Sequence, residues 1–244
     1  MLMASAKLLL PYPFTTKLPG PRYSHRRFTC SSVIAQSGSA KEHLLALIAD
    51  QDRGIRTQSD PAKRAAIVQA IDAVASAGAG SVTTGDALSA TWRLLWTTEK
   101  EQLFIIEKAP LFGTRAGDVL QVIDVRERTL NNVISFPPDG VFFVRSSIEV
   151  ASPQRVNFRF TSAVLRGKNW EIPLPPFGRG WFDTVYLDDD LRVVKDIRGD
   201  YLVVNRASYN WKECMESSSS LSLLPMMMFC IGLYLLRMIL VLWR

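Results

Sequence analysis

The sequence predicts a mainly β protein whose short strands form an antiparallel barrel or sandwich. Apolar and polar residues alternate with a period of two through most of residues 87–206, which is the spacing of a strand with one buried face. Turn residues divide this region into about eight or nine short runs, as is typical of barrels and sandwiches. The 14 Gly and 13 Pro are dispersed along the chain, which also favours many turns.

Residues 1–36 have the composition of an organellar transit peptide. They contain five Lys or Arg, many hydroxyl residues and no Asp or Glu, and their apolar run Leu8–Leu10 is too short for a secretory signal. A disordered N-terminal tail is the alternative. Removing these five of the 29 basic residues leaves 24, against 23 acidic residues. Five of the six net positive charges therefore come from this leader, and we do not expect nucleic acid as a partner.

The distribution of Cys and His excludes several common catalytic sites from the β region. Residues 87–206 contain neither residue type, so they cannot supply a thiol nucleophile, a Ser-His pair or a His/Cys zinc site. Cys30, Cys214 and Cys230 all lie outside this region, and we expect no disulfide in the body. We therefore predict no catalytic residue, no metal and no cofactor.

Residues 41–78 predict two helices that form a cap on the β region. Asp60 is a suitable N-cap residue, Pro61 suits the first helical position, and Gly78 is a natural stop. Apolar residues recur at helical spacing in both segments, which indicates a buried face. They are Leu44, Leu47 and Ile48 in the first, and Ile67, Val68, Ile71, Val74 and Ala75 in the second.

The predicted strands of residues 87–206 place aromatic side chains on one face. Three strands carry these side chains, and in each the named residues share one face. They are Trp92, Leu94 and Trp96 in TWRLLWTT; Phe142, Val144, Ile148 and Val150 in VFFVRSSIEV; and Val156, Phe158, Phe160 and Val164 in VNFRFTSAVL. DVLQVIDV, TLNNVISF, WEIPL, WFDTVYL, LRVVKDI and YLVVNR complete the set, with a turn at Pro137–Gly140. Residues 103–112 are ambiguous, and we favour a short helix across one mouth of the barrel.

A barrel of about eight strands can just enclose one small apolar ligand. The residues predicted to contact such a ligand are Trp96, Phe136, Phe142, Phe158 and Phe160. The alternative is that the aromatic rings pack on one another and leave no cavity. The alternation pattern does not decide between these two arrangements.

Two long stretches resemble a known family. LSATWRLLWTTEKEQLFII and SSIEVASPQRVNFRFTSAVLRGKNWEIPLPPFGRGWFDTVYLDDDLRVVKDIRGDYLVVNRA are similar to the plastid lipid-associated protein or fibrillin family, over about residues 41–213. The resemblance implies a lipocalin-like barrel that binds carotenoids, prenylquinones or other plastid lipids, at plastoglobules or thylakoid membranes of the chloroplast. It thereby favours a ligand cavity or a lipid-adhering surface. A scaffold that recruits plastid enzymes is one alternative, and an enzyme of lipid or quinone metabolism is another.

The resemblance to lipocalins also implies a closure of one barrel end. A lipocalin has a Trp on its first strand and a late Arg packed over it, and the matching residues here are Trp92 and Arg192. Ala90 stands where the lipocalin pattern has Gly. A guanidinium on an indole face contributes about 0.5–2 kcal/mol, so we expect both residues to be structural.

Two short segments of the β region have alternative interpretations. Asp188–Asp190 form an acidic run that we interpret as a polar hairpin turn, because adjacent solvated carboxylates are too few for a calcium site. Pro173–Asp183 is rich in Pro and Gly and carries Phe177, Trp181 and Phe182. This segment is either a loop that dips into a lipid surface or a rigid loop packed on the barrel end.

The C-terminal tail differs in character from the rest of the chain. Residues 221–243 are apolar apart from Arg237, and a helix of that length could span a hydrocarbon core of about 30 Å. The family resemblance ends before this segment. A transmembrane helix and an altered gene product therefore remain two alternatives for the tail.

Overall fold

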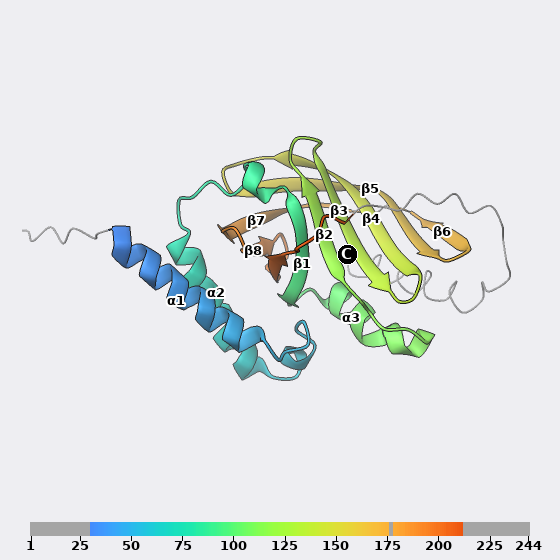
Figure 1. Cartoon of the computed structure of the whole chain (residues 1–244), viewed down its shortest axis with the longest axis horizontal. Helices are drawn as coiled ribbons and strands as arrows, with labels where there is room; N and C mark the ends of the chain where they lie inside the picture. Colours follow the sequence, from blue (N-terminus) through green and yellow to red (C-terminus); the bar gives the residue numbers. More distant parts are fainter. Residues whose placement is uncertain (1–29, 176–177, 212–244) are drawn as a thin grey trace, which may run out of the picture.

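The computed structural model describes residues 30–175 and 178–211, and within them strands predominate (Figure 1). The helices are α1 (Cys30–Ile48), α2 (Pro61–Ala77) and α3 (Lys100–Lys108), with 3₁₀ turns η1 (Arg56–Gln58), η2 (Asp86–Leu88) and η3 (Ala109–Phe112). The strands are β1 (Ala90–Thr97), β2 (Val119–Asp124), β3 (Thr129–Phe136), β4 (Gly140–Val150), β5 (Arg155–Gly167), β6 (Trp170–Leu174), β7 (Arg179–Leu187), β8 (Leu191–Asp196) and β9 (Tyr201–Arg206).

The nine strands form one antiparallel sheet with a ring-like arrangement. Their order is β4-β3-β2-β1-β9-β8-β7-β5-β6, and β4 also pairs with β5. That pairing joins the two sides of the sheet, because the N-terminal half of β5 pairs with β7 while its C-terminal half pairs with β6. The sheet thus has an inward face and an outward face. The mainly β antiparallel class predicted from the period-two pattern is confirmed.

Both predicted N-terminal helices are present, and the second has the predicted ends. The Asp60 carboxylate accepts a hydrogen bond from the Lys63 backbone N–H at 2.8 Å, and Pro61 occupies the first turn. α2 ends at Gly78, where a Cβ atom would lie only 3.1 Å from the Val185 carbonyl oxygen on β7. Glycine therefore permits a close approach of the helix end to the sheet.

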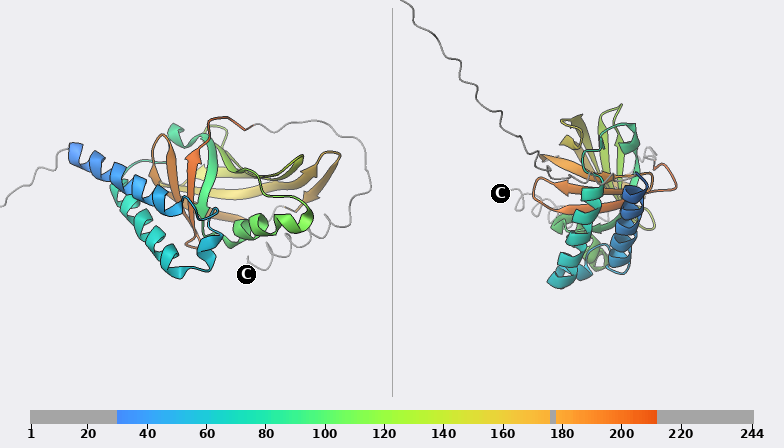
Figure 2. Two further views of the ribbon diagram at one scale, coloured as in Figure 1. Left: turned by 60° about the horizontal axis from the view of Figure 1, so that its bottom comes forward. Right: turned by 90° about the vertical axis from the view of Figure 1, so that its left-hand side faces the viewer.

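α1 and α2 pack side by side on the outward face of the sheet (Figure 2). The buried faces of these helices contact outward side chains of β1, β7, β8 and β9 in one apolar cluster. This cluster, which we call the helix-side core, contains Leu44, Ile48, Ile67, Ala70, Ile71, Val74, Trp96, Tyr186, Leu191, Val193 and Val203. The helices thus cover the sheet, as their apolar spacing predicts.

Three β-bulges interrupt the regular alternation of the strands. Register shifts occur in β1 between Leu94 and Trp96, in β5 opposite the Arg145/Ser146 step of β4, and in β7 between Thr184 and Tyr186. A bulge adds one residue to a strand, so every side chain beyond it changes face. The sequence-based placement of Trp96 beside Trp92 on the inward face is therefore wrong.

The same effect changes the predicted faces of β5. Phe158 and Phe160 lie before the shift and pack with the inner cluster. After the shift Leu165 lies inward, while Val164 packs on the outer cluster formed by Leu120, Val133 and Phe143. The prediction of Val164 on the inward face is therefore also wrong.

The ambiguous segment that follows β1 is helical. α3 and η3 occupy residues 100–112, and α3 lies across one end of the ring below β1 (Figures 1 and 2). None of the helices within the described residues has both the length and the apolar character required to cross a bilayer. The candidate membrane segment 221–243 lies outside the described residues.

Candidate functional site: an apolar cavity inside the sheet

A cavity of about 210 Å³ lies inside the ring and is partly open to solvent. Eight of the nine strands, all except β6, and helix α3 contribute residues to its walls, and most of these residues are apolar. The apolar lining residues are Trp92, Leu94, Ile105, Val119, Leu120, Leu130, Val133, Ile134, Phe142, Val144, Phe158, Phe160, Phe182, Val194, Leu202 and Val204. The question that the alternation pattern left open is thus answered by a hollow interior.

Three of the five residues predicted to contact a ligand line this cavity. Phe142, Phe158 and Phe160 belong to its wall, and the rings of Phe158 and Phe160 stack with their centroids 5.3 Å apart. Phe136 packs against the inner cluster but does not line the cavity. Trp96 lies in the helix-side core, fully buried, where its indole N–H donates to the Thr57 hydroxyl at 3.2 Å.

A chain of polar side chains crosses the interior beside the apolar wall. The Gln121 amide donates to the Asn132 side-chain oxygen at 3.1 Å and accepts from Arg192 Nη1 at 2.9 Å. Arg192 Nε lies 3.4 Å from the Thr184 hydroxyl, to which it donates. Gln121 and Asn132 also line the cavity, so these four residues connect β3, β2, β8 and β7 through the inside of the ring.

Arg192 is buried without a carboxylate partner among the described residues. Its exposed fraction is 0%, its Nη2 has no hydrogen bond, and burial lowers its pKa to about 9. Its guanidinium carbon lies 5.9 Å from the Trp92 ring centroid and 5.0 Å from that of Phe182. The contact between Trp92 and Arg192 that the resemblance implied is thus present, although it is long.

A second arginine packs closer to Trp92 than Arg192 does. The Arg206 guanidinium lies 4.6 Å from the Trp92 ring centroid and donates to the backbone carbonyls of Asp189 and Ala87, at 2.6 and 3.0 Å. The Trp92 indole N–H donates to the Leu88 carbonyl at 2.9 Å. These contacts form what we call the Trp92 end of the ring, and Arg206 is a closing residue that the sequence comparison missed.

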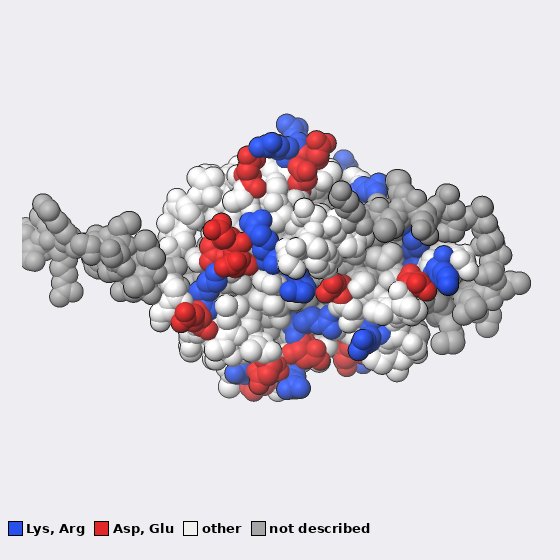
Figure 3. Space-filling view, in the orientation of Figure 1, with Lys and Arg blue, Asp and Glu red and all other residues white. Residues whose placement is uncertain are grey.

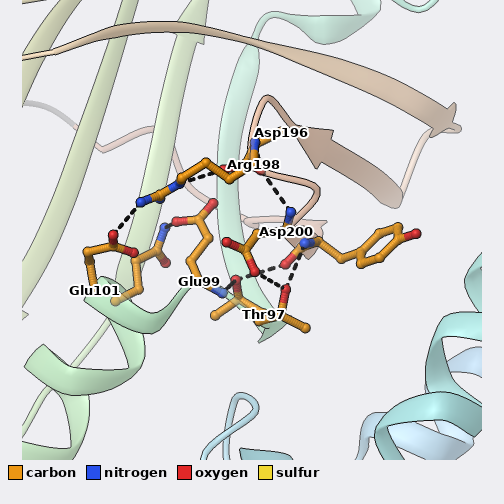
Figure 4. A network of polar contacts seen from close by, with 9 residues as sticks. Thr97, Glu99, Glu101, Asp196, Arg198 and Asp200 are labelled. Atoms are coloured by element: carbon orange, nitrogen blue, oxygen red, sulfur yellow. Dashed lines mark hydrogen bonds and ion pairs between the residues drawn. The ribbon is translucent and has the colours of Figure 1, made fainter. Parts of the chain in front are cut away.

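At the opposite end of β1, a group of acidic side chains surrounds one arginine. We call this end of the ring the α3 end. Glu99, Glu101 and Gln102 come from the start of α3, Asp196 is the last residue of β8, and Arg198 lies in the turn between β8 and β9; all five line the cavity. Arg198 forms an ion pair with Glu101 and lies 3.5 Å from Asp196. Figure 4 shows the carboxylates of Glu99, Glu101 and Asp200 gathered near the Arg198 side chain.

The Glu99 carboxyl group is the most perturbed acid of this end. Burial raises its pKa to about 8, and the negative charge of Asp196 acts in the same direction, while Arg198 opposes it. Glu99 is therefore largely protonated at neutral pH. Its Oε2 accepts a hydrogen bond from the Gln102 side-chain N–H. The Gln102 Oε1 is buried and has no hydrogen-bond partner.

Two of the three residues considered for a lipid-surface loop lie in the predicted strand WFDTVYL instead. Trp181 and Phe182 belong to β7, and Phe177 lies outside the described residues. Phe182 is only 4% exposed and lines the cavity, because strand alternation turns its ring inward. Trp181 lies on the other face, where the Arg155 guanidinium stacks 3.7 Å from its ring centroid. Phe182 therefore has no access to a lipid surface.

The acidic run Asp188–Asp190 forms the turn between β7 and β8, as predicted. Asp188 accepts from the backbone N–H groups of Asp190 and Leu191 at 2.9 and 2.7 Å, and from Lys41 Nζ at 2.7 Å. Burial opposes ionisation of Asp188, but these hydrogen bonds outweigh it and lower its pKa. The described residues contain no group of three or more His, Cys, Asp or Glu placed to hold a metal ion.

Charged side chains of both signs are interspersed on the face shown in Figure 3. Ion pairs among the described residues include Arg126 with Asp86 at 2.7 Å and Arg155 with Asp183 at 2.8 Å. This face therefore presents mixed charge rather than a field of one sign.

Comparisons with known proteins agree with the family resemblance of the two long stretches of residues 41–213. The family model PAP_fibrillin matches residues 38–205. The chain is 70% identical, over 187 residues, to the probable plastid-lipid-associated protein 11, chloroplastic, of Arabidopsis thaliana, which covers 77% of this chain and 88% of that protein. No solved structure matches. The chain therefore belongs to the PAP/fibrillin family.

Proposed function

We propose that this protein is a plastid lipid-associated structural or carrier protein that holds part of a hydrophobic small molecule in its inner cavity. The observation that carries the proposal is the hollow interior, whose wall is largely aliphatic and aromatic. Such a wall favours hydrocarbon over water, because burial of apolar area contributes about 25 cal/mol per Å². The family membership and the name of the Arabidopsis relative support lipid as the ligand class.

The volume of the cavity limits how much of a lipid it takes. Pockets for drug-sized ligands usually measure about 300–1,000 Å³, whereas this one is about 210 Å³. A carotenoid or a prenylquinone is therefore too large to be enclosed as a whole. We propose that one end of such a molecule enters the cavity against Phe142, Phe158 and Phe160, and that the remainder stays in a lipid phase.

This partial enclosure suits a protein that works at a lipid surface. Plastoglobules and thylakoid membranes of the chloroplast are the locations that we propose, with residues 1–36 as the transit peptide that directs import. The chloroplast assignment is supported by the name of the Arabidopsis relative. The absence of Cys and His from residues 87–206 supports a binding role rather than an enzyme.

Filling the cavity tests the proposal directly. In Val144→Phe a larger side chain enters the hollow, because Val144 lines it and is 8% exposed. We expect this variant to lose most of its affinity for a fluorescent apolar dye, measured by titration. Val150→Phe is the matched control, since it makes the same change on the same strand at a site that is 45% exposed. Equal dye affinity in the two variants and the wild type would refute the cavity as the binding site.

Native mass spectrometry of protein gently purified from chloroplasts separates the carrier from its main alternative. A stoichiometric lipid on the wild type, absent from Val144→Phe, supports a carrier. A protein partner without any lipid supports a scaffold that recruits plastid enzymes.

A further inference from the structure

We infer that the cavity selects neutral lipids whose inserted end carries a hydroxyl group, and that Glu99 and Gln102 recognise that group. This inference rests on the proposed lipid-binding function and deepens it. It names the polar chemistry of the ligand, which the apolar wall alone does not specify.

The first argument is an acceptor without a donor at the cavity wall. Gln102 lines the cavity, and its Oε1 is buried and unpaired, while its Nε2 donates to Glu99. An unsatisfied buried polar atom is unfavourable in a folded protein, and such atoms are rare. A ligand hydroxyl that donates to Gln102 Oε1 would remove this penalty.

The second argument is the donor that Glu99 provides beside that acceptor. Glu99 also lines the cavity, and one oxygen of its carboxyl group accepts a hydrogen bond from Gln102. Withdrawal from water keeps this group protonated at neutral pH, and the other oxygen then carries the proton. A hydroxyl group both donates and accepts. It is therefore complementary to the pair formed by Gln102 Oε1 and the Glu99 O–H.

The third argument is the charge around this pair, which excludes an anionic head. Glu101, Asp196 and Asp200 surround Glu99, and their negative charges are among the causes of its raised pKa. Arg198 is already engaged by Glu101 and Asp196. A fatty-acid carboxylate would enter a site of net negative charge and be repelled. Arg192, the cation inside the ring, is fully buried and does not belong to the cavity wall.

Two isomeric probes test the inference. Decanol and nonyl methyl ether have the same atoms, but only the alcohol donates a hydrogen bond. The dissociation constant of each probe is measured by displacement of the apolar dye. It is then corrected by the water–hexadecane partition coefficient of that probe, which removes the difference in general affinity for an apolar phase. We expect the wild type to favour decanol by about tenfold, as one hydrogen bond of about 1 kcal/mol or slightly more would give.

Gln102→Met removes the acceptor and keeps a side chain of similar length. We expect it to abolish the preference for decanol while it retains affinity for the ether. Gln58→Met is the matched control, because Gln58 is exposed on η1 and does not line the cavity, and it should keep the tenfold preference. The melting temperature of each variant shows whether it is folded. The preference of the wild type for decanol over the ether, after correction for partition, tests the hydroxyl site even if a variant does not fold.

The outcomes separate this inference from the proposed function. Binding of both probes to the wild type with no corrected preference would overturn the hydroxyl site and leave the lipid cavity standing. Equal loss of both probes in Gln102→Met would overturn it as well, because Gln102 would then only support the wall. Tighter binding of decanoate than of decanol would contradict the charge argument. If neither probe binds and the dye also fails to bind, the proposed function itself is refuted.

Discussion

The two ends of strand β1 differ in what their polar groups do. At the Trp92 end, Arg206 covers the indole ring and donates to two backbone carbonyls. At the α3 end, Glu99 and Gln102 face the cavity, and the Gln102 oxygen has no partner. Satisfied polar groups stabilise a fold, whereas an unsatisfied group at a cavity wall is available to a ligand. We therefore assign stability to the first end and selectivity to the second.

The largest expected effect is on the Trp92 end. Trp92→Ala removes a fully buried ring that lines the cavity and contacts both arginines. We expect a loss of about 3–5 kcal/mol of stability, which lowers the melting temperature by roughly 6–20 °C. Calorimetry or a dye-based melt measures it. Val82→Ala, at a site that is 70% exposed, should leave the melting temperature unchanged. An equally small shift for Trp92→Ala would contradict the assigned role.

The pH dependence of stability sharpens the comparison at the α3 end. The pKa of Glu99 is raised from 4.5 to about 8, so between these values the folded protein keeps a proton that the unfolded chain releases. Stability from this group is therefore fully present below pH 4.5 and is lost as the pH rises to about 8.

Glu99→Gln mimics the protonated acid and removes this titration. Relative to the wild type, we expect the variant to be more stable by about 1–3 kcal/mol at pH 8 and above, and equally stable near pH 4.5. Urea unfolding across this pH range measures the difference. Glu107→Gln, at an exposed site on the same helix, is the control. A constant difference between Glu99→Gln and the wild type would show that folding does not raise the pKa of Glu99.

A smaller effect is expected for the arginine that covers Trp92. Arg206→Met keeps an apolar stem over the ring but loses the charge and both hydrogen bonds. A cation on an aromatic face contributes about 0.5–2 kcal/mol, so the melting temperature should fall by roughly 1–8 °C, with dye affinity unchanged. Arg179→Met, at an exposed position of β7, provides the comparison. A loss of dye affinity in Arg206→Met would place ligand selectivity at the Trp92 end.

The smallest expected effect concerns the link from α1 to the turn beside the Trp92 end. Lys41 lies 2.7 Å from Asp188, and the pKa of Asp188 is lowered by that hydrogen bond among others. Lys41→Met should cost no more than about 1 kcal/mol. A lowered pKa contributes its full stability above the ordinary value of 3.8, so the difference should disappear as the pH falls from 3.8 through the lower pKa of the folded state. A difference that persists at low pH would indicate lost packing instead.

Much of the fold was predictable because local chemistry determines it. The Asp60 cap, Pro61 and Gly78 define α2 from short-range effects that any sequence shows. Period-two alternation located the strands, and it placed Phe142, Phe158 and Phe160 on the cavity wall.

The remaining features depend on long-range pairing, which alternation does not reveal. The bulge in β1 turned Trp96 toward the helices, and nothing in the apolar pattern marks the extra residue. Phe182 was assigned both to the strand WFDTVYL and to a lipid-surface loop, because Pro and Gly precede it, and it belongs to strand β7. Arg206 could have been found from its parity with Val204, since both lie on the inward side of β9. Glu99 and Gln102 gave no signal, as their role depends on α3 crossing the ring.

The loop between α1 and α2 is anchored on the strand that leads to Glu99. The Thr97 N–H donates to the Arg53 carbonyl at 3.1 Å, Arg53 Nη1 donates to the Gly117 carbonyl at 2.8 Å, and a Cβ on Gly54 would lie 2.2 Å from the Thr97 oxygen. Only glycine therefore fits at position 54, where the loop and the strand are in direct contact. The backbone therefore ties the outer helix pair directly to the segment that carries Glu99 and Gln102.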